Sequence, residues 1–398
     1  MPQQIVKQRS RGFICINAHP EGCARNVQHQ IDAVLQARPA GTIGPKNVLV
    51  IGSSTGYGLA TRIAAAWGFG AKTLGVFFER PPDGNRTASA GYYNTAALHR
   101  LAREAGLWAE GLNVDAFSGE GKQQTIDLIR QGMGKVDLVV YSLASPRRTH
   151  PKTGEIFNSA LKTIGDPFTG KTVDLSSGEV KEITIEPATE LEISDTIAVM
   201  GGEDWKLWIE LLLSEGLLAD GARTVAYSYV GPRLTWPIYR HGTIGIAKKD
   251  LEETAHWLDT RLASSVGGNA WVSVNKAVVT QASAAIPVVS LYISLLFRVM
   301  KQRGSHEGCI EQISRLCFDQ LAAGKTVATD DGRLIRLDDR EMQDDVQSEV
   351  AELWSRVTTE NLLEISDFGT FRQEFSNLFG FHVDGVDYEA LAETDVTL

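Results

Sequence analysis

The sequence predicts an α/β protein built on a doubly wound parallel sheet, and three observations support that class. The apolar run 47–51 ends in a Gly-rich turn, and a helical pattern follows over 59–67. A second β-branched run, 73–78, comes after this helix. Apolar runs and helical patterns then keep alternating as far as residue 275. Such alternation implies right-handed βαβ units, so we expect a Rossmann-type sheet with helices on both faces.

Six segments are expected to form the strands. Strands in the middle of a parallel sheet are buried on both faces, so they read as nearly unbroken apolar runs. The expected strands are 48–51, 73–78, 108–114, 136–142, 224–229 and 270–275. A helix is expected over 244–262 with Thr243 as its N-cap, and an apolar helix is expected from residue 286.

We expect the whole chain, 1–398, to form a single enlarged domain, because no internal repeat or low-complexity linker divides it. Three additions to the core are expected. They are an N-terminal extension, an insertion and a C-terminal extension, over 1–45, 146–203 and 318–398.

Each addition carries its own local signals. The N-terminal extension predicts a short strand or hairpin near 13–16 and a helix near 25–37. In the insertion, two alternating runs around a Ser-Ser-Gly turn predict a hairpin, and in the C-terminal extension two runs around Asp-Asp-Gly predict another. These pairs of runs are 171–175 with 179–185 and 326–329 with 333–337, and a helix over 344–358 follows.

Composition excludes several classes of function. The net charge of -10 argues against a general nucleic-acid-binding protein, whose binding surface would be basic. Four cysteines and no visible secretory signal indicate a cytoplasmic protein. The most apolar stretch, 286–300, is too short for an ordinary membrane span. Cys15, His19 and Cys23 lack a fourth ligand at useful spacing, so no metal site is expected.

The Gly-rich turn predicts a dinucleotide site. Its spacing, Gly52-x3-Gly56-x-Gly58, is typical of short-chain dehydrogenase/reductases. Small residues let the backbone approach phosphates, and the following helix N-terminus offers free N–H groups and a positive dipole end. Glu79 ends the second strand, where a carboxylate can accept hydrogen bonds from the adenosine ribose diol. A structural turn and a surface carboxylate are the alternative.

Further cofactor contacts are expected beyond the carboxyl ends of the other strands, where open parallel sheets bind ligands. Asp115 and Ala116 would meet the adenine edge, and the small residues 142–145 would let a cofactor lie against the sheet. Residues 278–280 would touch the nicotinamide carboxamide. The helix from residue 286 would either wall an apolar acyl pocket or simply be buried.

Tyr239 and Lys248 are the expected catalytic pair. A phenol has a pKa of about 10, and a nearby ammonium favours its phenolate form. Together they can stabilise and help protonate the oxyanion formed when a hydride arrives. In one continuous helix, Tyr-x8-Lys would place the two side chains roughly 180° apart, so the helix must begin after Tyr239. A core tyrosine and a solvated lysine are the alternative.

Several motifs together closely resemble the FabV-type trans-2-enoyl-ACP/CoA reductases, which have an enlarged short-chain dehydrogenase fold. The likeness runs from about residue 5 to residue 388. Besides the turn and the Tyr-x8-Lys spacing, the motifs are Ile16-Asn-Ala-His-Pro-Glu-Gly-Cys23, Tyr141-Ser-Leu-Ala-Ser-Pro146, Met200-Gly-Gly-Glu-Asp-Trp205, Tyr227-Ser-Tyr229 with Gly231-Pro232, and His306-Glu-Gly-Cys-Ile-Glu311. The resemblance implies a monomer that uses NADH to reduce the C2–C3 double bond of an enoyl thioester, the last step of a fatty-acid elongation cycle.

The resemblance also implies roles for single residues. Tyr239 would be catalytic, Lys248 would bind the cofactor, and Tyr229 would contact the substrate. Arg80, beside Glu79, leaves some room for the 2′-phosphate of NADPH. The implied cofactor positions are Gly52, Ser53, Ser54, Thr55, Gly56, Tyr57, Phe78, Glu79, Asp115, Ala116, Leu143, Ala144, Val278, Val279 and Thr280.

Two other functions and the identity of the acyl donor stay open. A ketoreductase would place a serine thirteen residues before the tyrosine, where this chain has Ala226, although Ser228 lies close by. A non-catalytic NADH-sensing protein would not need the Tyr239 and Lys248 pair. The acyl donor is enoyl-ACP or enoyl-CoA. An acidic carrier protein would dock transiently on a basic patch of the surface, and the alternative is that the basic residues of this patch are ordinary solvated surface residues. The candidates for that patch are Arg147, Arg148, Arg233, Arg240 and His241.

Overall fold

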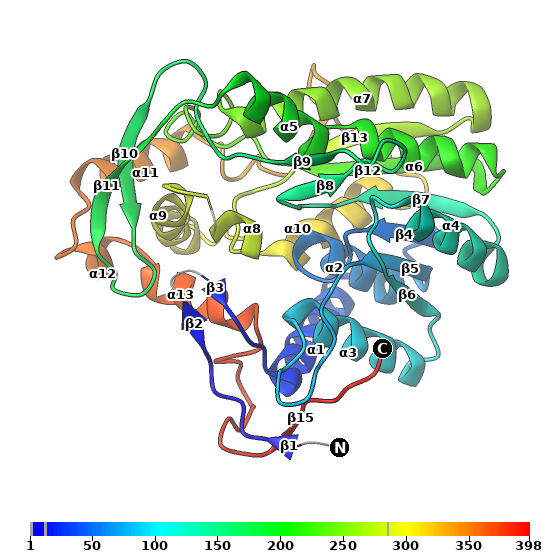
Figure 1. Ribbon diagram of the computed structural model, residues 1–398, viewed down its shortest axis with the longest axis horizontal. Helices are drawn as coiled ribbons and strands as arrows, with labels where there is room; N and C mark the ends of the chain where they lie inside the picture. The colour runs from blue at the N-terminus through cyan, green and yellow to red at the C-terminus, as the bar shows by residue number, and fades with distance from the viewer. Residues whose placement is uncertain (1–2, 12–13, 285) are drawn as a thin grey trace.

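The computed structural model describes residues 3–11, 14–284 and 286–398 and confirms the α/β class (Figure 1). Its core is a seven-stranded sheet in which all neighbouring strands are parallel. The chain order reverses between β4 and β7, a switch point of the kind where open α/β sheets bind ligands. In spatial order the strands are β14 (Leu334–Arg336), β13 (Asn269–Val274), β12 (Leu218–Ser228), β7 (Val136–Tyr141), β4 (Asn47–Ile51), β5 (Lys72–Phe77) and β6 (Ala109–Asn113).

Helices cover both faces of this sheet, because successive side chains of a strand point to opposite sides. In β4, Val48 and Val50 belong to one apolar cluster, and Leu49 and Ile51 belong to another. The first cluster includes side chains of α1 (Pro20–Ala37), α2 (Gly56–Ile63), α3 (Ala90–Glu104) and α10 (Cys309–Arg315). The second includes side chains of α4 (Gly119–Leu128), α6 (Glu203–Ser214) and α7 (Thr243–Val266). Burial on both faces explains the unbroken apolar runs of the central strands.

The insertion and the C-terminal segment share a third apolar cluster beside the sheet, at the left of Figure 1. The predicted hairpin of the insertion is confirmed as β10 (Phe168–Val173) paired antiparallel with β11 (Val180–Ile185). Lys171 fastens this hairpin to the end of α11 (Asp344–Arg356). Its Nζ donates to the carbonyl oxygens of Trp354, Ser355 and Val357 at 3.0–3.1 Å.

The remaining elements are α9 (Val289–Gln302), a buried helix of the third apolar cluster, and segments outside the central sheet. Three π-helical segments, η1 (Ala64–Gly68), η2 (Ile129–Met133) and η3 (Leu316–Leu321), continue α2, α4 and α10. The others are β1 (Gln3–Gln4), β2 (Ser10–Arg11), β3 (Ile14–Cys15), β8 (Arg147–Thr149), β9 (Ile156–Asn158), α5 (Glu190–Met200), α8 (Gln281–Ala284), α12 (Leu362–Ile365), α13 (Phe368–Asn377) and β15 (Ala392–Glu393).

The predicted C-terminal hairpin is wrong. Residues 325–330 form no strand, and β14 instead pairs parallel with β13, with Ile335 opposite Ser273. The turn itself exists, since the Asp330 carboxylate accepts hydrogen bonds from two backbone N–H groups beyond it. Strand β14 pairs with the free edge of the sheet and not with the preceding segment, because pairing with the sheet buries Ile335, which is 1% exposed.

The predicted N-cap of α7 is also wrong. Gly242 occupies the N-cap position, and Thr243 is already helical. The Thr243 hydroxyl donates to the carbonyl oxygen of Ala160 in the insertion, so it is not free to cap its own helix. The helix nevertheless begins after Tyr239, as the predicted pairing of Tyr239 with Lys248 requires.

Two predicted helices begin at other residues than expected. Helix α1 begins at Pro20, ahead of the expected start, because the His19 ring caps it by accepting the N–H of Gly22 at 3.2 Å. The apolar helix expected from residue 286 begins at Val289.

In the hairpin expected near 13–16, β2 pairs with β3, while residues 12 and 13 lie outside the described residues. Within the described ranges, no helix has both the length and the apolar character needed to cross a membrane.

Candidate active site

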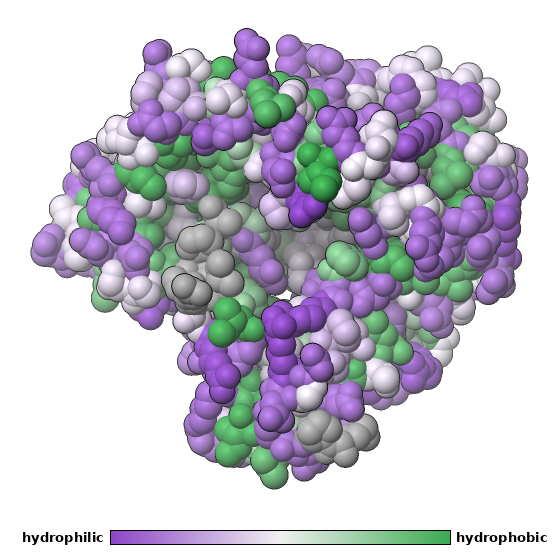
Figure 2. All heavy atoms as spheres, viewed as in Figure 1, coloured by the Kyte–Doolittle hydropathy of each residue, from purple (hydrophilic) through white to green (hydrophobic). Residues whose placement is uncertain are grey.

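A cavity of about 740 Å³ lies beyond the carboxyl ends of β4, β5, β7, β12 and β13, at the switch point of the sheet. Figure 2 shows this face of the molecule hollowed near its centre, between the region of β8 and β9 above and that of α2 below. All the predicted cofactor, substrate and catalytic residues line the cavity except Ser53 and Val279.

The Gly-rich turn forms one part of the cavity wall. Gly52 has a φ of +84°, and a side chain there would meet the carbonyl group of Ser142, so this position needs glycine. Thr55 is the N-cap of α2 but makes no side-chain hydrogen bond to it. The first N–H groups of α2 therefore remain available to an anion such as a pyrophosphate. Ser53 is buried beneath the turn and donates its hydroxyl to the carbonyl of Val76 at 3.2 Å.

Glu79 is held in place by its neighbours. The Ser54 hydroxyl donates to Glu79 Oε1 at 2.7 Å, and the Glu79 N–H donates to the Asn113 side chain at 2.7 Å. Gly91 makes room for the carboxylate, since a side chain there would collide with it. Phe78, next to Glu79, is 77% exposed and offers a flat apolar surface at this end of the cavity.

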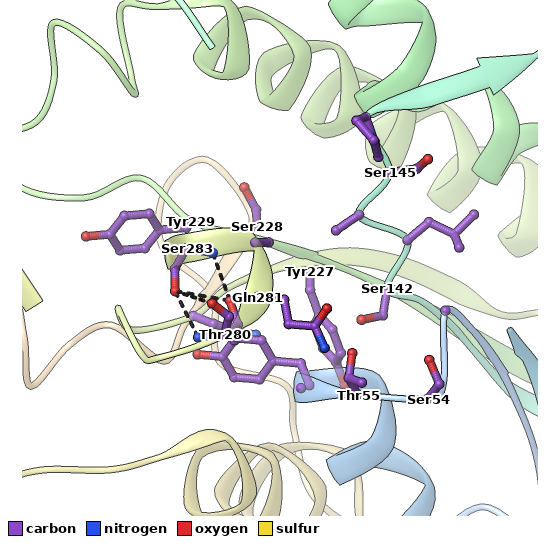
Figure 3. Close-up of a pocket in the computed structure, with 18 of the residues that line it drawn as sticks. Ser54, Thr55, Ser142, Ser145, Tyr227, Ser228, Tyr229, Thr280, Gln281 and Ser283 are labelled. Atoms are coloured by element: carbon purple, nitrogen blue, oxygen red, sulfur yellow. Dashed lines mark hydrogen bonds between the residues drawn. The ribbon is translucent and has the colours of Figure 1, made fainter. Parts of the chain in front are cut away.

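The loop after β13 forms another part of the wall (Figure 3). Val278 and Thr280 line the cavity, whereas Val279 packs into the third apolar cluster. The Ser283 hydroxyl donates to the Val278 carbonyl at 2.7 Å and accepts the Thr280 N–H at 2.9 Å. These bonds fix the loop as a turn ahead of α8. Leu143 and Ala144 line the cavity from the loop after β7, and Asp115 and Ala116 line it from the loop after β6.

Tyr239 and Lys248 reach the same cavity from different elements. Tyr239 lies in the turns before α7, and Lys248 lies in the second turn of that helix. Lys248 Nζ donates to the Tyr227 carbonyl at 3.3 Å, and burial lowers the pKa of this lysine to about 8. Lys249, by contrast, is exposed.

The protonation state of Tyr239 differs from the expected one. Burial raises the pKa of Tyr239 above its usual value, instead of the lowering expected from a nearby ammonium. Its side chain is 7% exposed, and its hydroxyl makes no hydrogen bond to any described residue. The resting form is therefore a neutral phenol, which can donate a hydrogen bond to a ligand in the cavity.

Tyr229 lines the cavity beside Tyr239 and is anchored from behind. Its hydroxyl donates to Glu341 Oε1 at 3.0 Å. The other oxygen of this carboxylate accepts the N–H of Ala277, which also lines the cavity, at 2.7 Å. Glu341 is fully buried, and its pKa is raised by that burial.

Two buried polar atoms of the wall have no partner in the described part of the chain. They are the hydroxyl of Ser228 and the side-chain nitrogen of Asn275. Unpaired polar atoms are costly when buried, and a polar ligand in the cavity would satisfy them. Together with the open N-terminus of α2 and the carboxylate of Glu79, they fit a dinucleotide such as NADH. Neither Asn275 nor Lys276 was among the predicted site residues, although their position directly after a strand is a signal for such residues.

Three of the arginines considered for ligand contacts are placed differently from one another. Arg80 is not part of the cavity wall, and its Nη2 donates to the Thr87 carbonyl at 3.4 Å. The prediction that Arg148 belongs to a basic surface patch is wrong, because this residue is 1% exposed and pairs with Glu203 at 2.7 Å. Arg147 is exposed and lines the cavity.

Comparison with known proteins identifies the family. Residues 86–322 match the family described as the trans-2-enoyl-CoA reductase catalytic region, and residues 5–84 match the NAD(P)H binding domain of trans-2-enoyl-CoA reductase. The chain belongs to the trans-2-enoyl-CoA reductase family. This confirms the resemblance expected from the sequence motifs.

Several known proteins match the chain over nearly its whole length. An enoyl-acyl-carrier-protein reductase (NADH) of Coxiella burnetii is 57% identical over 392 residues, which are 98% of this chain and 96% of the relative. A protein of the same name from Opitutus terrae is 56% identical over 97% of this chain and 98% of its own length. The crystal structure of Treponema denticola trans-2-enoyl-CoA reductase in complex with NAD superposes with a TM-score of 0.95. It is 48% identical and covers 99% of this chain and 100% of that one.

A further match, over residues 329–391, is described as an enoyl reductase FAD binding domain. The residues of this stretch do not fit a flavin. None of them lines the 740 Å³ cavity, and α11 and α13 bury their apolar side chains in the third cluster. Glu341, which lies in this stretch, touches the cavity wall only from behind, through Tyr229 and Ala277.

Proposed function

We propose that this chain uses NADH to reduce the C2–C3 double bond of trans-2-enoyl thioesters, the final step of the fatty-acid elongation cycle. When bound, NADH supplies the hydride, which is added to C3 of the substrate. The observation that carries the proposal is the convergence of Tyr239, Lys248 and the Gly-rich turn on one cavity. Membership of the trans-2-enoyl-CoA reductase family supports the same reaction.

Tyr239 is the proposed catalytic residue. As C3 gains the hydride, the electrons of the double bond move towards the thioester oxygen, which becomes an enolate. The enolate then takes up a proton at C2, which the Tyr239 hydroxyl supplies and water replaces. The neutral phenol of Tyr239 donates a hydrogen bond where this negative charge develops. Lys248 holds the nicotinamide ribose and keeps positive charge near the phenol. Tyr229 contacts the substrate.

The cofactor-binding residues proposed from the sequence keep that role, in two groups. Ser53 and Val279 support the wall from behind, since neither lines the cavity. The direct contacts are Gly52, Ser54, Thr55, Gly56, Tyr57, Phe78, Glu79, Asp115, Ala116, Leu143, Ala144, Lys248, Val278 and Thr280.

We further propose a basic and aromatic docking surface for the acidic acyl carrier protein, made of Arg233, Trp236 and Arg240. Both arginines are exposed, and their guanidinium groups lie 5.9 and 5.4 Å from the centre of the Trp236 ring. Neither pairs with a carboxylate among the described residues. The surface adjoins Tyr239 along the chain, so a carrier docked there would deliver its acyl chain near the phenol.

Three organisational features of the chain also remain proposals. We propose that the chain works in the cytoplasm, on the basis of its few cysteines, all of which are free in the described residues. We propose that it acts as a single enlarged domain and as a monomer. Light scattering coupled to size-exclusion chromatography tests the last point.

The decisive assay compares crotonyl-CoA with acetoacetyl-CoA in the presence of NADH. Turnover of crotonyl-CoA alone supports the enoyl reductase. Turnover of acetoacetyl-CoA would favour a ketoreductase, for which the unpaired Ser228 hydroxyl in the cavity wall would be the specific observation. NADH binding without turnover of either thioester would leave a non-catalytic NADH-sensing protein.

A further inference from the structure

One buried carboxylate outside the cavity connects two parts of its wall. Glu341 lies between β14 and α11 and is 0% exposed. Its Oε1 accepts the hydroxyl protons of Tyr229 at 3.0 Å and Tyr292 at 2.7 Å, and its Oε2 accepts the Ala277 N–H at 2.7 Å. All three partners are donors, so the geometry is that of a carboxylate with both oxygens used.

The surroundings of Glu341 hold it in this position and favour its ionised form, which burial alone disfavours. Gln347 donates to its backbone carbonyl at 2.6 Å and to the Tyr292 hydroxyl at 3.1 Å. Lys276, which is 1% exposed, attracts the carboxylate electrostatically and donates its Nζ to the Ala277 carbonyl at 2.7 Å. Both peptide groups of Ala277 are thus bonded to buried charged side chains, immediately before the loop that carries Val278 and Thr280.

We infer that Glu341 is a positioning residue for the reductase reaction, which orients the Tyr229 hydroxyl on the substrate side and anchors the Ala277 loop on the nicotinamide side. The inference rests on the proposed function. Because the proton of Tyr229 is committed to Glu341, the Tyr229 hydroxyl acts as an acceptor towards any other group. Tyr239 is then left as the hydrogen-bond donor of this pair for the thioester oxygen. The C-terminal segment thereby contributes to the site through one side chain that never touches a ligand.

The variant Glu341→Gln tests the contact with Tyr229 separately from the contact with Ala277. The glutamine amide has one acceptor, its oxygen, and one donor, its NH₂. The NH₂ cannot face the Ala277 N–H, because both groups are donors. The amide oxygen therefore stays on Ala277, and the NH₂ faces the tyrosines, which must now accept. We expect the NADH dissociation constant to change less than about threefold and kcat/KM for crotonyl-CoA to fall about tenfold or more, the scale of a lost hydrogen bond to a charged group.

A double-mutant cycle with Tyr229→Phe tests whether Glu341 acts through Tyr229. If it does, Glu341→Gln costs less than about threefold in kcat/KM in the Tyr229→Phe background. Equal losses in both backgrounds would overturn the inference. Tyr292→Phe is the matched control, because it removes the other donor to the same oxygen while Tyr292 lies outside the cavity wall. We expect this variant to lower the melting temperature and to keep kcat/KM within about threefold of the wild type.

Glu341→Leu tests the loop-anchoring half without any turnover. It leaves the Ala277 N–H unpaired, so NADH affinity by fluorescence titration should fall at least about fivefold below that of Glu341→Gln. Equal NADH affinity in the two variants, with both folded by circular dichroism, would overturn this half. Failure of the wild type to reduce crotonyl-CoA would instead refute the proposed function, and the NADH titrations would still report on the anchor.

Discussion

Tyr229 stands edge-on to Tyr239, with ring centroids 4.9 Å apart and ring planes at 77°. This is a favourable arrangement for two aromatic rings, because the positive edge of one meets the negative face of the other. Tyr229 follows β12, and Tyr239 comes from the turns before α7, so the contact joins the proposed substrate-binding tyrosine to the proposed catalytic one. The neighbouring ring also helps to exclude water from Tyr239, whose pKa is raised by burial.

Tyr239→Phe should leave NADH binding nearly intact while lowering kcat with crotonyl-CoA by at least about a hundredfold, the usual scale for losing an oxyanion or acid group. The ring and its contact with Tyr229 remain, so only the hydroxyl is lost. Fluorescence titration of NADH and steady-state kinetics measure the two effects. Tyr388→Phe is a control, since its hydroxyl bonds only to the backbone near Gly380 and Val383. A near-wild-type kcat in Tyr239→Phe would mean that another group holds the enolate.

The pH profile should report Lys248. The pKa of this lysine is lowered to about 8, so the side chain is an ammonium below that pH and neutral above it. Loss of the charge would remove the proposed contact to the ribose and the proposed positive charge near the phenol. We therefore expect kcat/KM, which reflects the free enzyme, to fall as pH rises through about 8.

Variants of the two adjacent lysines show which side chain causes this fall in kcat/KM at alkaline pH, called here the alkaline limb of the profile. Lys248→Met should lose the limb together with most NADH affinity and turnover. Lys249→Met should keep both, because Lys249 is exposed and points about 100° away on the helix. A limb that persists in Lys248→Met would belong to Lys276, which also lines the cavity and has a pKa of about 8. Greater loss of NADH affinity in Lys249→Met would reverse the assignment.

Much of the fold could be predicted because its signals are local. The central strands are apolar runs of the right length, and the glycine spacing before α2 marks the turn that needs a positive φ at Gly52. The hairpin of the insertion follows from alternating runs around a Ser-Ser-Gly turn. Placement of these elements by βαβ rules then brings Tyr239 and Lys248 to the same end of the sheet.

What could not be predicted depends on partners far away in the sequence. Ile335 joins the edge of the sheet next to Ser273, although its nearest neighbours suggested a hairpin. Thr243 is bonded to Ala160 instead of capping its helix. Glu341 shows no local pattern at all, because its role depends on contacts with Tyr229 and on a loop 64 positions away in sequence. Pairings of this kind become visible only in the folded chain.

Glu79 should make the enzyme prefer NADH over NADPH. Its carboxylate would accept hydrogen bonds from the ribose diol and repel a 2′-phosphate. Glu79→Ala should narrow the ratio of kcat/KM values for the two cofactors. Ser54→Ala is the matched control: it removes the hydroxyl that donates to Glu79 Oε1 but leaves the charge, so it should keep a strong preference for NADH. Equal kcat/KM values for both cofactors in the wild type would refute the role of Glu79.

If the surface around Trp236 binds the carrier protein, the KM for an enoyl-ACP should depend on the salt concentration. Acyl carrier proteins are acidic, and attraction between exposed charges weakens as salt shortens the screening length, which is about 8 Å at physiological ionic strength. We expect the KM for an enoyl-ACP to rise with salt in the wild type. In the Arg233→Ala/Arg240→Ala double variant, KM should be several times higher at low salt and should respond less to added salt.

Two controls separate docking from chemistry. An enoyl N-acetylcysteamine thioester has neither a carrier protein nor phosphates, so its kcat/KM should be similar in the wild type and the double variant. Arg100→Ala/Arg103→Ala removes two exposed charges from α3, whose arginines do not line the cavity, and should leave the KM for enoyl-ACP unchanged. A flat salt response in the wild type, or an unchanged KM in the Arg233/Arg240 variant, would remove the docking surface. The enolate would still depend on Tyr239, because that phenol lies inside the cavity and the two arginines lie on the surface.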